Sequence, residues 1–135
     1  MKNNIIYFVG LGAVVSVLFL AIVSAWIGFT VADSCQRARD QYELESCDSA
    51  LVAVLNDTNQ PYRVRNDAIW ALGQYGDAKV LPELEKYYTG DIPEREPYND
   101  GLSQYELQKA IDLLNGKFNI TVFFRALLLG RVENE

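Results

Sequence analysis

The chain has 135 residues and a net charge of −6, with no histidine and two cysteines. An acidic surface repels phosphates, so the charge argues against nucleic acid as a partner. The absence of histidine removes the usual general base at neutral pH and the commonest metal ligand, and the two cysteines lack the spacing of a zinc or redox motif. We therefore expect no catalytic site, no metal, no cofactor and no small-molecule substrate.

Residues 1–32 predict a transmembrane anchor. No charged residue occurs from Asn3 to Ala32, and the segment from Ile5 to Thr30 holds fifteen Leu, Ile, Val or Phe side chains. Together these favour membrane insertion by about 6 kcal/mol. Tyr7 and Trp26 stand about 28 Å apart along a helix, which matches a hydrocarbon core of about 30 Å with an aromatic side chain at each interface. The apolar stretch is also longer than that of a cleaved signal peptide.

Small side chains recur at four-residue spacing in this anchor, at Gly12, Ser16, Ser24 and Gly28, with Leu20 in the same register. Such a strip lets another membrane helix approach closely. Small residues are also common in helices that face only lipid, so the strip has two interpretations.

Residues 33–47 form a polar connector that contains both cysteines, Cys35 and Cys47. On one unbroken helix their Cα atoms would lie about 18 Å apart, beyond the roughly 7 Å limit for a disulfide, so a bridge requires a turn between them. Bridged cysteines would place the following domain outside the cytoplasm, whereas free buried thiols would not. Positive charges flank the anchor almost equally on both sides. We expect a single-pass protein of a bacterial cytoplasmic membrane with its domain on the extracytoplasmic side.

The segment from 48 to 116 predicts four short helices. Asp48 is the expected N-cap of the first, and Pro61 opens the second at a position where a missing N–H is harmless. The second helix has apolar residues at spacings of three and four, which predict a buried face: Val64, Ala68, Ile69, Ala71, Leu72 and Tyr75.

A tight corner separates the second and third helices. Gly76 is placed to end one helix in the left-handed conformation, and Asp77 to cap the next, which runs from 78 to about 88. Ser103 and Glu106 predict a capping box at the start of the fourth helix.

The stretch RVRNDAIWALGQYGDAKVLPEL, residues 63–84, resembles the bacterial HEAT-like repeat, of the type also found in phycobilin lyases. The residues that match its pattern are Val64, Arg65, Ala68, Ala71, Leu72, Gly73, Gly76, Asp77, Leu81, Pro82 and Leu84. The resemblance implies an all-α fold, in which a single transmembrane helix is followed by a short α-α repeat domain over 48–116. A proline-rich acidic insertion after Thr89 and the lack of a second such corner depart from the family pattern.

Repeat units of this kind stack because one unit cannot bury its own apolar face, and about three are needed for stability. This chain has about two, so we expect apolar surface that a neighbour must cover. The apolar C-terminal segment, 117–135, has three interpretations: a cap on the repeat core, a helix in the membrane interface, or a docking surface.

The insertion combines acidic residues with tyrosine, a composition typical of binding surfaces. Its expected partner-binding residues are Asp91, Glu94, Glu96, Tyr98 and Asp100. From these features we expect a non-catalytic accessory or assembly subunit that holds integral membrane proteins of a larger complex. Two alternatives are a bilin-lyase-like enzyme component, implied by the resemblance, and a membrane-tethered adaptor that recruits soluble proteins.

Overall fold

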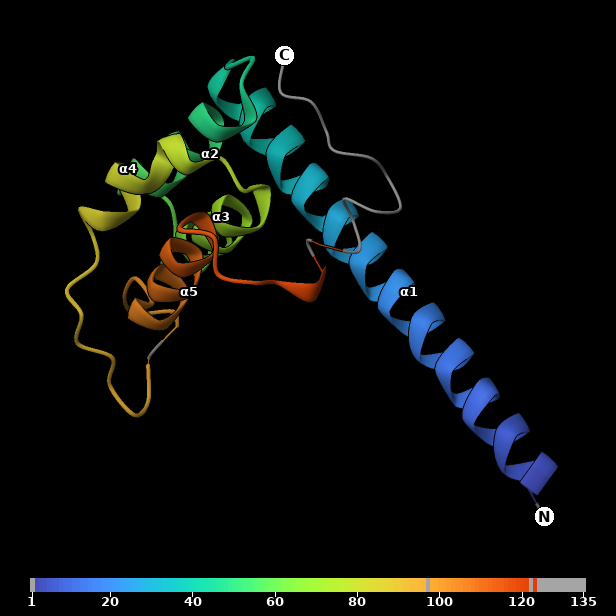
Figure 1. Ribbon diagram of the computed structural model, residues 1–135. Coiled ribbons are helices and arrows are strands. Elements are labelled where there is room, and N and C mark those ends of the chain that lie inside the picture. Colours follow the sequence, from blue (N-terminus) through green and yellow to red (C-terminus); the bar gives the residue numbers. More distant parts are fainter. Residues whose placement is uncertain (1, 97, 122, 124–135) are drawn as a thin grey trace. The chain divides into compact units, whose positions relative to one another are not determined.

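The computed structural model describes residues 2–96, 98–121 and 123. Over these ranges the chain is all-helical, with five α-helices, one 3-10 turn and no strand (Figure 1). The elements in chain order are α1 (Lys2–Tyr42), α2 (Cys47–Asn56), α3 (Tyr62–Tyr75), η1 (Ala78–Val80), α4 (Leu81–Glu85) and α5 (Gln104–Leu114). The expected all-α class is confirmed.

The chain divides into two compact units, and the boundary between them falls inside α1. One unit is Val31–Phe118, which contains the last turns of α1 and all of α2 to α5; it is called the helical unit below. The other consists of Met1–Thr30 and Asn119–Glu135.

The first part of α1 carries the apolar residues that the sequence assigns to a membrane anchor. Most of its large apolar side chains are exposed: Tyr7 is 78% exposed and Trp26 is 70% exposed. A core helix of a soluble protein is mostly buried, whereas none of the most apolar window of this helix is. In the part of the chain that the structure describes, α1 is the one helix long and apolar enough to cross a membrane, and it is a candidate span.

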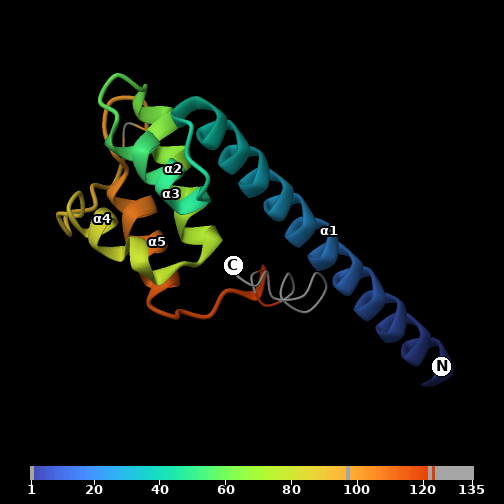
Figure 2. The same ribbon diagram turned by 90° about the horizontal axis from the view of Figure 1, so that it is seen from above.

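The helical unit is built around α3, which packs against both α2 and α5 (Figure 2). Four residues of its expected apolar face are buried, namely Ala68, Ile69, Ala71 and Leu72. Val64 is instead 39% exposed, while Arg65 and Asn66 are 6% and 0% exposed. The buried stripe of α3 is therefore rotated toward two polar residues, because both find hydrogen-bond acceptors or donors outside the helix.

Arg65 fixes α3 to the end of α2. Its Nε donates to the Leu55 carbonyl oxygen at 2.8 Å, and its guanidinium carbon lies 5.6 Å from the ring centroid of Tyr62 and 5.9 Å from that of Tyr87. The charge thus lies at the C-terminal end of α2, where the helix dipole favours a cation, between two aromatic rings that attract it.

The tight corner after α3 forms as the sequence predicts. Gly76 has a φ of 85° and donates its N–H to the Leu72 carbonyl at 3.3 Å, and the Asp77 carboxylate accepts from the Lys79 N–H at 3.0 Å. A left-handed glycine followed directly by an N-cap reverses the chain within two residues.

Gly73 allows α3 and α5 to pack at close range. A Cβ built on Gly73 would lie 2.7 Å from the Cα of Ala110, well inside van der Waals contact. The approach is possible because neither residue carries a large side chain.

Two local predictions are wrong in detail, and a third, the capping box at α5, is only partly right. Asp48 does not cap α2, since Ser46 is the N-cap and the buried Asp48 carboxylate lies 2.7 Å from Lys79 Nζ. The third predicted helix is split into η1 and α4, because Pro82 has no N–H to donate to Ala78 and Leu81 bonds that carbonyl instead.

The capping box at α5 is only half made. Ser103 Oγ accepts from the Glu106 N–H at 3.1 Å, but the Glu106 carboxylate pairs with Lys109 at 3.6 Å. The backbone N–H of Ser103 donates instead to Asn66 Oδ1, so a residue of α3 takes the place of Glu106.

The helical unit covers most of its own apolar surface. The large apolar side chains that are exposed in its described residues are few: Leu44, Tyr62, Val64, Ile92, Tyr98, Tyr105 and Phe118. The end of α1 and the segments on either side of the α4–α5 loop complete the core through Cys35, Tyr42, Tyr87, Tyr88 and Leu102. The described part of the helical unit thus exposes few large apolar side chains, and most of segment 117–135 lies outside the described residues.

Candidate functional site

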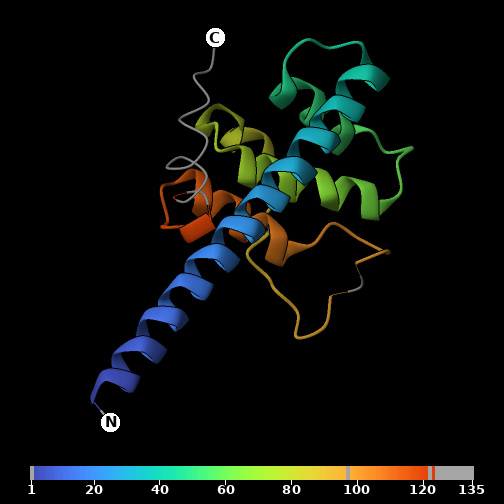
Figure 3. The same cartoon turned by 90° about the vertical axis from the view of Figure 1, so that its right-hand side faces the viewer.

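The predicted partner-binding residues lie in the long connection between α4 and α5, drawn in yellow and orange in Figure 3. Asn66 of α3 holds the end of this loop that leads into α5. Its Nδ2 donates to the carbonyls of Tyr98 and Gly101 at 2.9 and 3.0 Å, and its Oδ1 accepts from the Ser103 N–H at 2.9 Å. Three backbone groups of the loop are thus satisfied by one buried side chain.

The side chain of Gln104, the first residue of α5, holds the other end of the loop. Gln104 Oε1 accepts from the Thr89 N–H at 2.8 Å, and Gln104 Nε2 donates to the Tyr87 carbonyl at 3.1 Å. One end of the α4–α5 connection is therefore held by Gln104 of α5 and the other by Asn66 of α3.

Two of the five predicted residues are used to build the loop. Glu96 Oε1 accepts from the Tyr105 N–H at 3.0 Å and Oε2 accepts from the Ser103 hydroxyl, so its carboxylate caps the N-terminus of α5. Tyr98 donates its hydroxyl to Asp67 at 2.9 Å. Burial, and then the bond to this carboxylate, raise the pKa of Tyr98 well above its usual value.

The remaining three predicted residues, Asp91, Glu94 and Asp100, are exposed carboxylates on the same loop. No ion pair of theirs occurs among the described residues, although Arg95 is their neighbour in the sequence. A fixed loop presents this charge with less loss of entropy on binding than a mobile loop would. We call these three residues the loop carboxylates.

The two cysteines are joined by a disulfide, with their Cα atoms 5.2 Å apart. The turn that the sequence requires between them is the end of α1, where Glu43 has a φ of 53° and the Leu44 N–H donates to the Arg39 carbonyl at 3.3 Å. This hydrogen bond is typical of a helix end that closes with a left-handed residue, a position that glycine usually occupies and that Glu43 occupies here.

Two further residues near the end of α1 contact the helical unit on the same side of the helix as Cys35. Ala38 is 3% exposed in the core, and Tyr42 donates its hydroxyl to Asp57 Oδ2 at 2.7 Å. The Tyr42 hydroxyl bond lowers the pKa of Asp57. The last two turns of α1 are thus fixed to the helical unit by the disulfide, by the Ala38 methyl group and the Tyr42 ring in the core, and by hydrogen bonds of the Tyr42 hydroxyl with Asp57 and Gln60.

Of the small residues predicted to pack in the membrane, two bond to each other: Ser16 Oγ donates to the Gly12 carbonyl at 2.9 Å. A Cβ on Gly12 would meet nothing within 4 Å. Ser24 is buried. Packing of a second membrane helix at Gly12, Ser16, Ser24 and Gly28 stays a prediction.

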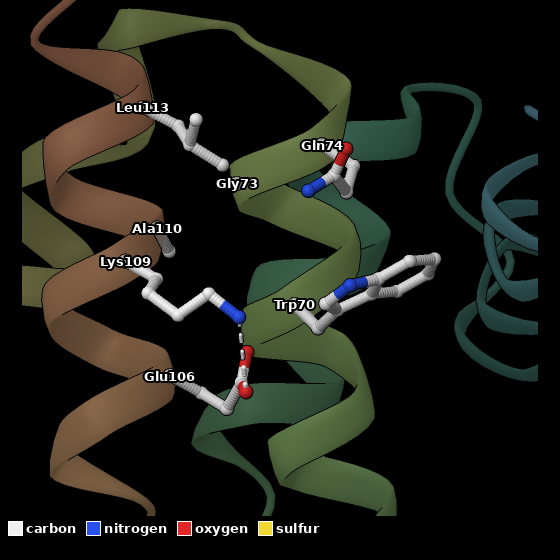
Figure 4. A pocket seen from close by; sticks show the side chains of 7 residues that line it. All are labelled: Trp70, Gly73, Gln74, Glu106, Lys109, Ala110 and Leu113. Carbon is white, nitrogen blue, oxygen red and sulfur yellow. Dashed lines mark ion pairs between the residues drawn. The ribbon is translucent and has the colours of Figure 1, made fainter. Parts of the chain in front are cut away.

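Two hollows of the described surface lie beside charged side chains. The first, between α3 and α5, has a volume of about 10 Å³, room for about one water molecule. Figure 4 shows Trp70 and Gln74 of α3 on one side of it and the Glu106–Lys109 pair of α5 on the other. It is far below the several hundred Å³ of a small-molecule site.

The second hollow is an open groove of about 340 Å³ between α2 and the η1–α4 segment, lined by Asp48, Ser49, Val52, Lys79, Val80 and Glu83. Lys79 Nζ lies 2.7 Å from Asp48 Oδ2 and 2.9 Å from Asp77 Oδ2. These carboxylates raise the pKa of Lys79, and its ammonium lowers that of Asp77. The pairing joins α2 to the corner after α3.

No group of three or more His, Cys, Asp or Glu residues with the geometry to hold a metal ion occurs in ranges 2–96, 98–121 and 123.

The chain is similar to the deoxyhypusine hydroxylase of Schizosaccharomyces pombe, with 33% identity over 75 residues. The match covers 54% of this chain and 24% of that protein, so the chain spans about a quarter of the length of this relative. No protein-family model matches the sequence, and no solved structure matches it.

This similarity contradicts the expectation that the chain is not an enzyme, since the relative is named for a hydroxylase activity. That expectation depended on the absence of histidine. Histidine is the commonest general base, but carboxylates, tyrosine and lysine also transfer protons, so its absence excludes less than we inferred.

Asn66 and Arg65 are the residues whose roles the sequence analysis missed. Both were hidden by the assumption that the apolar residues alone mark the buried face of α3. The available signal was their spacing: Arg65 stands three residues before Ala68 and Asn66 three residues before Ile69, which places them on the buried side of the helix.

Proposed function

We propose that this chain is a single-pass membrane protein whose helical unit, a short HEAT-like repeat, is an accessory scaffold that holds a neighbouring integral membrane protein. The observation that carries the proposal is the continuity of α1. One helix provides an uncovered apolar stretch of membrane length and, from Val31 on, part of the packed helical unit. A partner bound to this unit would be kept at the membrane surface.

The repeat assignment is supported by the residues that match the HEAT-like pattern. Gly73 permits close helix packing, Gly76 and Asp77 make the corner, and Arg65 joins consecutive helices. These are the interactions that a stacked pair of helices needs.

The disulfide supports the proposed side of the membrane. Bridged cysteines persist in oxidising compartments, so Cys35–Cys47 supports an extracytoplasmic helical unit. The loop carboxylates then form the exposed surface to which a basic or neutral protein surface would bind.

Affinity purification of the full chain from detergent-solubilised membranes tests this proposal. We expect larger integral membrane proteins to co-purify at low salt, and the triple variant Asp91→Asn, Glu94→Gln, Asp100→Asn to recover at least five-fold less of them. The matched control removes three other exposed charges, with Asp40→Asn, Glu43→Gln and Glu45→Gln, and is expected to retain the partners.

Recovery of the full chain alone, or an equal loss in both triple variants, would reject binding through the loop. A chain whose helical unit is labelled by a membrane-impermeant reagent only after cell lysis would reject the extracytoplasmic assignment.

A second candidate, favoured by the 33% identity to the yeast relative, is a hydroxylase-related enzyme or a component of one. Incubation of the purified chain with a deoxyhypusine-containing protein under air, followed by mass spectrometry, tests it. Gain of one oxygen atom by the substrate would support this candidate, and an unchanged substrate mass would reject activity of the chain alone.

A further inference from the structure

The Cys35–Cys47 bridge connects two sulfurs in unequal surroundings. Cys47 is the first residue of α2 and is 9% exposed, whereas Cys35 lies on the side of α1 and is only partly buried. Cys35 is thus the more exposed residue of the pair, which favours it as the point of attack for an incoming thiolate.

The two cysteines also differ in how well the surrounding charge stabilises a thiolate. A thiolate at the N-terminus of a helix is stabilised by the N–H groups and the dipole of the first turn, so Cys47 is the better leaving group. The adjacent Asp48 would oppose this effect, but its carboxylate is paired with Lys79 at 2.7 Å. Access and leaving-group stability thus favour the same direction of attack.

We propose that Cys35–Cys47 is an exchangeable disulfide that a dithiol reductant opens by attack on Cys35, and that its opening releases the last two turns of α1 from α2. In the first step the attacking thiolate bonds to Cys35 Sγ, the bridge breaks, and Cys47 leaves as a thiolate. The second thiol of the reductant then displaces Cys35 and forms the reductant's own disulfide. The reductant loses two electrons and two protons, and the protein gains two thiols.

Release follows from how little else holds this face of α1. Apart from the bridge, the described contacts of this face are the Ala38 methyl group in the core, the partly buried Tyr42 ring, and the Tyr42 hydroxyl, which donates to Asp57 and accepts from Gln60 Nε2 at 3.4 Å. The turn beyond it begins with the left-handed Glu43, a conformation that a residue with a side chain adopts only under constraint. With the bridge open, the segment 36–46 loses the constraint that keeps this turn in place.

The direction of attack is tested with the full chain in detergent, using reduced glutathione as the attacking thiol. After acid quenching and alkylation, peptide mass spectrometry locates the glutathione. We expect it on Cys35 at least ten-fold more often than on Cys47. A majority on Cys47, no reaction without denaturant, or two free thiols before treatment would each overturn the proposal.

The release is tested by hydrogen exchange of the full chain before and after reduction with dithiothreitol. We expect the amides of residues 38–44 to exchange at least ten-fold faster after reduction, with those of α3 unchanged. The double variant Cys35→Ser, Cys47→Ser should exchange like the reduced chain, and Tyr42→Phe, which keeps the bridge, like the oxidised chain. Unchanged exchange at 38–44 on reduction would overturn the release.

Neither measurement depends on partner binding. Failure of the proposed scaffold function would leave the exchange chemistry standing, and an inert bridge would leave partner capture untouched.

Discussion

Asn66 is a polar residue in the middle of a helix, and its side chain is fully buried. An asparagine at such a position normally competes with the helix backbone or points to solvent. Here it bonds three backbone groups of the loop before α5, which lie 32 to 37 residues away in the chain. The loop conformation therefore depends on a residue outside the loop.

We expect Asn66→Ala to destabilise the helical unit by about 3 kcal/mol, since it leaves two carbonyls and one N–H without a partner. Thermal unfolding of the full chain in mild detergent measures this. The matched control is Asn59→Ala, an exposed asparagine whose bonds are confined to Asp57, for which we expect a loss below about 1 kcal/mol. Equal losses in both variants would show that the Asn66 bonds do not stabilise the loop.

Residues that act through their immediate neighbours were predictable. Gly76 and Asp77 make the corner because the backbone conformation that each prefers is a local property. Asn66 and Glu96 were not predictable in the same way. Their roles depend on groups that the fold brings to them, and a carboxylate in an acidic stretch looks the same in sequence whether it caps a helix or faces solvent.

At the scale of elements, the packing of α3 on α5 depends on one glycine. We expect Gly73→Ala to destabilise the unit by about 1 to 3 kcal/mol, because a methyl group 2.7 Å from the Ala110 Cα must push the helices apart. Gly101→Ala is the matched control, since a Cβ there meets nothing within 4 Å and its φ is not positive. Thermal unfolding of both variants checks this, and a neutral Gly73→Ala would mean that the helices are not in contact there.

The link between α2 and the corner after α3 predicts a pH dependence. Lys79 lowers the pKa of the Asp77 carboxyl below 3.8, its usual value. A carboxyl whose folded pKa is lowered adds stability that is present above its unfolded pKa and is lost as the pH falls through the folded pKa. We expect thermal stability to fall as the pH drops below about 4, through the lowered pKa of Asp77, and to fall less in Asp77→Asn.

The control for this dependence is Asp91→Asn, which removes an exposed loop carboxylate. It should keep the acid loss of the original chain. If Asp77→Asn shows the full acid loss, the Lys79–Asp77 pair does not contribute to it.

Element boundaries were predicted where capping residues mark them and missed where backbone chemistry overrides the pattern. The start of α5 at Ser103 is marked by its side chain, which caps the helix as expected. The third predicted helix failed because Pro82 removes one backbone donor, which changes the first turn to η1. The position of the turn that the disulfide requires was not predicted, because the sequence around Glu43 contains no glycine.

At the scale of the whole molecule, membrane insertion depends on the uncovered apolar part of α1. Val15 and Leu18 lie near the middle of the stretch from Tyr7 to Trp26 and are 57% and 56% exposed. A charged residue at the centre of a membrane helix costs roughly 2.5 to 3.5 kcal/mol, so two of them offset the estimated gain of about 6 kcal/mol.

We therefore expect Val15→Asp with Leu18→Asp to release the chain from membranes on alkaline extraction. The matched variant, Val15→Ala with Leu18→Ala, should remain in the membrane fraction. Immunoblots of the pellet and the supernatant distinguish them. Retention of the double aspartate variant would argue against a spanning α1.

The sequence by itself determined the helical class, the long apolar helix and the corner at Gly76 and Asp77. Each of these depends on composition or on contacts within one or two turns, and such short-range preferences can be read from consecutive residues. Only the tertiary structure decided which residues of the acidic loop remain free, which side of α3 is buried, and that the helical unit covers its apolar face with the end of α1. These outcomes depend on contacts between residues far apart in the chain, where packing and hydrogen bonding outweigh local preference.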